Sequence, residues 1–96
     1  MTYHNSSWTR VENVRSRSVF EMETCLVFTP DNPNLYSLNS TAWLVFELCD
    51  GRSFEDIKRS YYEAVEPLRS PEEANNDLIK ILIDLENKGI LEHNRS

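Results

Sequence analysis

The sequence of 96 residues predicts an α+β fold in which a three-stranded antiparallel sheet is followed by three helices. Two patterns support this class: apolar and polar residues alternate from Ser18 onward, and three later segments each begin with helix-start signals. The length suits one small domain with one core. No apolar run approaches the ~18 residues of a membrane span, and the first residues lack a signal-peptide pattern, so we expect a cytoplasmic protein that does not enter a membrane.

The predicted sheet begins at Ser18. Phe20, Met22, Leu26 and Phe28 share one parity, and this period of two is typical of a strand with one face on the core. Because one long strand would be too extended for so small a domain, we expect a break near Met22–Thr24 that forms a hairpin.

A third strand and a buried helix follow the hairpin. The proline-rich segment at 29–34 predicts a turn, after which Leu35–Leu38 forms the third strand. Asn39 is a good N-cap for a helix that continues to Cys49. This helix is apolar on nearly every side, which indicates a central, buried position.

The last two helices have clear boundaries. Ser53 caps the second helix, which ends at Glu66. The Ser70–Glu73 segment combines an N-cap serine, proline at the first helical position and a capping-box glutamate, and Gly89 ends this third helix. The short connection between the two suggests a helix-turn-helix. We place the domain at residues 18–92, between a mostly flexible segment at 1–17 and a flexible tail at 93–96.

The composition argues against an enzyme. The two histidines, His4 and His93, lie near the chain ends, no metal-ligand spacing occurs, and both glycines are isolated, so we expect no catalytic, metal or cofactor site. Cys25 and Cys49 are expected to be reduced and buried. A net charge of −6 opposes binding to nucleic acid. The composition therefore favours a binding or assembly module.

The third helix carries more apolar surface than one core contact requires. Its core stripe is formed by Ala74, Leu78, Ile81, Leu82 and Leu85. At about 100° per residue, Ile79 and Ile83 lie off this stripe, with Asn75 and Asn76 beside them. Either the N-terminal segment or the sheet covers this flank, or the flank forms a groove for a partner peptide.

The third strand offers a second candidate surface. Leu35, Tyr36, Ser37 and Leu38 include neither proline nor charge, and an edge strand of this kind is a template for β-augmentation. The alternative is that this edge has no binding role, because every open sheet has edges and most of them bind nothing.

Three blocks of the sequence together resemble one known family. They are Leu38–Trp43, then Leu48–Ser53 with Asp56–Ile57, then Asp77–Leu78 with Leu82, Leu85 and Lys88–Leu91. In order and spacing, over about residues 18–91, they resemble the PqqD-like proteins, peptide-binding domains also called RiPP recognition elements.

This resemblance implies a winged helix-turn-helix-like domain, with no catalysis of its own, that binds the leader of a ribosomally made precursor peptide. Such domains hold the leader for a modifying enzyme, such as a radical S-adenosylmethionine maturase or a lasso leader peptidase. In the family, the leader adds as an antiparallel strand to the third strand and packs its apolar side chains on the third helix. Carried over to this sequence, the site consists of Leu35, Tyr36, Ser37 and Leu38 on the strand and Asn75, Asn76, Ile79 and Ile83 on the helix.

Two other classes stay open. One is a DNA-binding winged helix, which the acidic third helix opposes, because five acids outnumber two lysines there. The other is a structural or oligomerisation module that exchanges the edge strand between copies. We expect a monomer, with a strand-exchanged dimer as the alternative.

Overall fold

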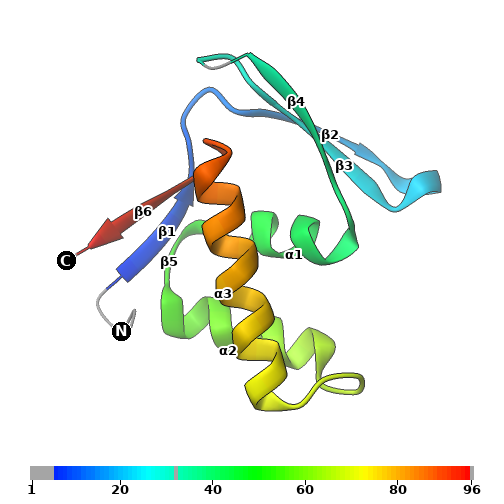
Figure 1. Cartoon of the computed structure of the whole chain (residues 1–96), viewed down its shortest axis with the longest axis vertical. Helices are drawn as coiled ribbons and strands as arrows, with labels where there is room; N and C mark the ends of the chain where they lie inside the picture. The colour runs from blue at the N-terminus through cyan, green and yellow to red at the C-terminus, as the bar shows by residue number, and fades with distance from the viewer. Residues whose placement is uncertain (1–5, 32, 96) are drawn as a thin grey trace.

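The computed structural model describes residues 6–31 and 33–95 (Figure 1). It confirms the α+β class, with a three-stranded antiparallel sheet followed by three helices, and it adds a second small sheet. In chain order the elements are β1 (Ser6–Arg10), β2 (Arg15–Val19), the 3-10 helix η1 (Phe20–Met22), β3 (Thr24–Thr29), β4 (Asn34–Leu38), α1 (Ser40–Leu48), β5 (Asp50–Ser53), α2 (Phe54–Val65), α3 (Pro71–Asn87) and β6 (Leu91–Arg95).

The predicted sheet has the order β2-β3-β4, with antiparallel pairing throughout. The break expected near Met22–Thr24 is present: η1 ends at Glu23, whose φ of 49° places it in the left-handed region. The backbone N–H of Glu23 donates to the Phe20 carbonyl, which closes the turn without glycine or asparagine.

The face of β3 that packs on the core differs from the predicted one. Cys25 and Val27 are buried against the helices, whereas Phe28 on the opposite parity is exposed. Phe20 and Met22 lie in η1 and are also exposed. A period of two groups the residues of each face, but it does not say which face meets the core.

A second sheet, of order β5-β1-β6, was not predicted. Residues 6–10 form its central strand, and Trp8 is buried there against His93 of β6, with ring centroids 4.3 Å apart. The flexible segment predicted at 1–17 is therefore wrong for β1 and for the start of β2, and the predicted tail at 93–96 is wrong for 93–95. Residues 1–5 and 96 lie outside the described residues.

The helices begin where the sequence predicts. The side chain of Asn39 accepts a hydrogen bond from the Ala42 N–H at 2.8 Å, and Ser53 caps α2 in the same way. Ser70 and Glu73 form the complete capping box of α3. Gly51, two residues after the C-cap of α1 and within β5, has a φ of 99°, a conformation that side-chain-bearing residues rarely adopt.

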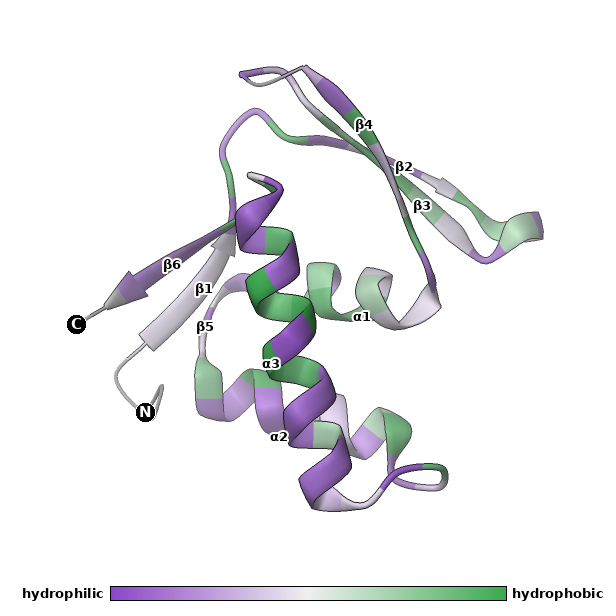
Figure 2. Ribbon diagram, in the orientation of Figure 1, coloured by the Kyte–Doolittle hydropathy of each residue, from purple (hydrophilic) through white to green (hydrophobic). Residues whose placement is uncertain are grey.

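The core lies between the helices and the two sheets. The buried side chains of α3 are Ala74, Leu78, Leu82 and Leu85, which is the predicted stripe except that Ile81 is only half-buried. Figure 2 shows α1 as largely hydrophobic, in keeping with its central place. In Figure 1, β4 lies on one side of α3 and the β5-β1-β6 sheet on the other. No helix within residues 6–31 and 33–95 has the length and hydrophobicity of a transmembrane span.

Candidate functional site

The strand β4 has one free edge. It pairs with β3 on one side only, as the last strand of its sheet. Leu38 is buried and Tyr36 half-buried on the face toward the helices, while Leu35 is 67% exposed on the opposite face. The free edge therefore offers backbone N–H and C=O groups to an incoming strand.

Charge distinguishes this edge from the others in the described sheets. The edge strand β2 carries Arg15 and Arg17, β5 carries Asp50 and Arg52, and β6 carries Glu92. Only β4, with the sequence NLYSL, has no charged residue and no proline among the four edge strands. Charges and prolines are common protections against edge pairing, so β4 is the edge best suited to accept a further chain.

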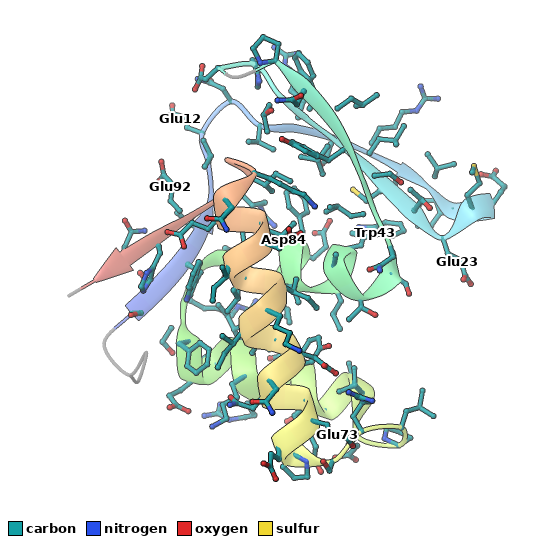
Figure 3. The ribbon with its side chains drawn as sticks, viewed as in Figure 1. Glu12, Glu23, Trp43, Glu73, Asp84 and Glu92 are labelled. Carbon is teal, nitrogen blue, oxygen red and sulfur yellow. The ribbon has the colours of Figure 1, made fainter. Side chains whose placement is uncertain are left out.

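A groove of about 360 Å³ lies next to the end of β4, between α1 and α3. Its lining combines apolar and aromatic groups with side chains of both charges. The lining residues are Asn39, Thr41, Ala42, Tyr61, Asp77, Lys80, Ile81 and Asp84. Figure 3 shows Asp84 on the side of α3 that faces α1.

Lys88 links α3 to β4. Its ammonium lies 5.5 Å from the centre of the Tyr36 ring and donates to the Asp84 carboxylate at 2.8 Å. Lys88 is the C-cap of α3, so this contact joins the C-terminal end of the helix to β4. Asp77, Ile81 and Asp84 lie on the same flank of α3 as Lys88 and line the groove between α1 and α3.

The charges of the groove are largely compensated. Arg69 lies 2.7 Å from Asp77, and Asp84 is paired with Lys88, while Lys80 forms no ion pair within the described part of the chain. Burial and the negative charge of Asp77 raise the pKa of Tyr61, which keeps this hydroxyl protonated at neutral pH. A nearly neutral, partly apolar groove suits an uncharged chain segment better than a polyanion.

The helix half of the predicted site is not next to β4. Ile79 is nine residues from Lys88, which places it about 180° around the helix from the residue that contacts Tyr36. Ile83 is 41% exposed on that same far flank. Asn75 lines a separate small pocket between α2 and α3, and Asn76 is exposed. The structure therefore brings Leu35–Leu38 together with the opposite flank of α3, not with these four residues.

The sequence contained no signal for this choice of flank. The apolar stripe of a helix has two borders. On α3, the sequence prediction used the border that contains Ile79 and Ile83, because it holds more isoleucine. The other border holds Ile81 among Asp77, Asp84 and Lys88, which resembles an ordinary solvated face. Only the position of β4 relative to α3 shows that this polar border lies beside the open strand.

The described residues offer little for catalysis. Burial raises the pKa of Cys49 to about 12 and also raises the pKa of Cys25, so both thiols stay protonated at neutral pH. Both are free and buried, as expected. Among the described residues, no group of three or more histidine, cysteine or acidic side chains is arranged to hold a metal ion. The features that remain are the open edge of β4 and the groove beside its end.

Comparison with known proteins assigns the family. The model described as "Coenzyme PQQ synthesis protein D (PqqD)" matches residues 24–91, more than two thirds of the chain. The chain therefore belongs to the PqqD family, and the resemblance seen in the sequence is confirmed.

One solved structure shares the fold. Titled "TbiB1 in Complex with the TbiA(beta) Leader Peptide", it matches with a TM-score of 0.72 and 19% sequence identity, over 88% of this chain and 94% of that chain. The comparison with curated proteins gave no match.

Proposed function

We propose that this protein is a non-catalytic peptide chaperone that binds the leader of a ribosomally synthesised precursor peptide. The leader adds as a strand to the free edge of β4 and places its apolar side chains in the groove beside the end of β4, between α1 and α3. The observation that carries the proposal is that β4, the one uncharged sheet edge in the described part of the chain, ends beside the groove between α1 and α3, while Lys88 of α3 contacts Tyr36 of β4.

Membership of the PqqD family supports this role, as does the shared fold of TbiB1, whose structure is a complex with a leader peptide. We assign the strand contacts to Leu35, Tyr36, Ser37 and Leu38. On the helix we assign Ile81, Asp84 and Lys88 in place of Asn75, Asn76, Ile79 and Ile83, because the first three lie on the flank beside β4.

Binding of this kind couples ordering of the peptide to association. A flexible leader loses chain entropy, and strand hydrogen bonds together with burial of a few apolar anchors offset that loss. Anchors that bury roughly 300 Å² supply about 7 kcal/mol before the ordering cost is subtracted. The bound leader then keeps the rest of the precursor at high effective concentration near a modifying enzyme, for which a radical S-adenosylmethionine maturase or a lasso leader peptidase are the two candidate types.

The DNA-binding alternative has less support. The acids of α3 at 72, 73, 77, 84 and 86 oppose phosphate contact, and of its two lysines Lys88 is already paired with Asp84. Exchange of β4 between two copies uses the same edge as the peptide, so it enters the test below as a competing outcome.

The test is amide hydrogen exchange of the full-length protein followed by NMR. The probes are synthetic peptides that correspond to the N-terminal segments of short reading frames beside its gene. Strand addition predicts that β4 amides facing the free edge become protected, whereas those of β2, the other edge of the same sheet, do not change. Protection of β4 without peptide, in a species of twice the mass, would favour strand exchange. Equal changes in β2 and β4, or none, would contradict the proposal.

A further inference from the structure

The outer face of the β2-β3-β4 sheet carries a second unusual surface. Antiparallel partners lie side by side on one face of a sheet, so the pairing register sorts the outward side chains into rows. One row is Arg15, Phe28 and Leu35, and the next is Arg17, Leu26 and Ser37. The inward residues Cys25 and Val27 alternate with these along β3 and are buried.

This outer face is apolar in its centre and open to solvent. Phe28 is 39% exposed and Leu35 is 67% exposed, although they are direct cross-strand partners. Two further exposed apolar side chains, Phe20 and Met22, lie at the tip of the same hairpin, but the Phe20 ring packs against Trp43 of α1 and so does not belong to the outer face. The apolar centre of the outer face is therefore the exposed cross-strand pair of Phe28 and Leu35. Adjacent exposed apolar side chains of this size mark an interaction surface.

The border of this face is basic. Arg15 and Arg17 are exposed and form no ion pair within the described residues, whereas the whole chain has a net charge of −6. Two uncompensated guanidinium groups beside an apolar row match a partner surface that is apolar and rimmed by carboxylates.

Strand addition to β4 would extend the same face. A chain paired with β4 places every second side chain outward, next to Leu35 and Ser37. The outer face would then contain residues of both the domain and the bound peptide, and only the loaded domain would present it in full.

We infer that the outer face of the β2-β3-β4 sheet, centred on Phe28 and bordered by Arg15 and Arg17, is the docking surface for the enzyme that modifies the bound peptide. This inference rests on the proposed peptide-binding function. The enzyme contributes a complementary apolar patch with acidic side chains, and it contacts the peptide's outward residues at the same time. Loading of the domain therefore raises its affinity for the enzyme.

The experiment uses the full-length domain, a peptide that it binds, and the peptide-modifying enzyme encoded beside its gene. The double variant Arg15→Glu/Arg17→Glu reverses the border charge, and Phe28→Ser removes the apolar centre. Lys58→Glu, at an exposed cation on α2, is the control because it reverses the charge of one cation elsewhere on the domain. Affinity for the peptide and affinity of the enzyme for the loaded domain are measured separately by calorimetry.

We expect each outer-face variant to weaken enzyme binding by roughly tenfold or more while peptide affinity stays within about twofold, and Lys58→Glu to change neither. Enzyme binding that stays within about twofold in both outer-face variants overturns the inference. So does a loss of peptide affinity in those variants, wild-type self-association that Phe28→Ser abolishes, or salt-sensitive DNA binding that the double variant abolishes. If the wild-type domain binds no peptide, the proposed function itself fails, and that result is distinct from all of these.

Discussion

The ammonium of Lys88 lies over the Tyr36 ring, 5.5 Å from its centre, and joins the end of α3 to the middle of β4. The same ammonium forms an ion pair with Asp84, one turn earlier on α3 and in the lining of the groove. Lys88 therefore contacts both the β4 strand and a residue of the groove.

The Lys88–Tyr36 contact should contribute measurably to stability. In a double-mutant cycle of Tyr36→Leu and Lys88→Met, we expect a coupling free energy of about 0.5–1 kcal/mol, the range of an exposed cation–π pair. Urea denaturation of the four proteins measures it. A coupling indistinguishable from zero would show that the two side chains do not attract each other in solution.

The two flanks of α3 can be distinguished with a matched pair of substitutions. Ile81→Ala removes an apolar group from the groove beside β4, and Ile83→Ala removes the same group from the far flank. We expect Ile81→Ala to weaken peptide binding by about tenfold and Ile83→Ala to weaken it by less than about twofold. Calorimetric titration with one peptide measures both. The reverse order would return the site to the flank with Ile79 and Ile83.

The N-terminal strand β1 should be essential for the fold. Trp8 is 1% exposed in the central strand of its sheet, so Trp8→Ala should lower the free energy of unfolding by about 3–5 kcal/mol. Trp43→Ala is the control, because Trp43 is only half-buried and lies beside the exposed Phe20. Chemical denaturation compares the two. A smaller loss for Trp8 than for Trp43 would mean that β1 is not held in the sheet.

The turn after α1 should show a defined pH dependence. The guanidinium of Arg52 donates two hydrogen bonds of 2.9 Å to the Asp50 carboxylate and lowers the pKa of Asp50 from 3.8 to about 2. Because the pKa is lower in the folded state, this carboxylate stabilises the fold fully above pH 3.8, and the effect is lost as the pH falls toward 2.

The stability difference between the wild type and Asp50→Asn should therefore be constant at neutral pH and should shrink with acidification. In Arg52→Met, an NMR titration of the Asp50 carboxyl should have its midpoint back near 3.8. An unchanged midpoint in that variant would assign the shift to another group.

Local signals in the sequence sufficed for the elements whose causes are local. The caps at Asn39, Ser53 and Ser70 each depend on a side chain and a backbone N–H within three residues, so their positions could be predicted to the residue. The uncharged edge at Leu35–Leu38 is likewise a property of consecutive residues. The family resemblance added the order in which these elements follow one another.

Pairing between distant segments could not be predicted in the same way. β1 and β6 are 80 or more residues apart in sequence, and neither shows an alternation strong enough to stand out without its partner. The sequence pattern therefore predicts a mostly flexible segment around Trp8. Its burial follows from a sheet that forms only when the two chain ends meet.

The sequence by itself determined that this is a small α+β domain with capped helices and an open, uncharged strand. The tertiary structure decided which face of β3 packs inward and which border of α3 lies beside β4. The physical reason is that a strand has two faces and a helical stripe has two borders. The periodicity of apolar residues does not show which of the two packs against the rest of the protein. Only the packing of one element against another makes them different.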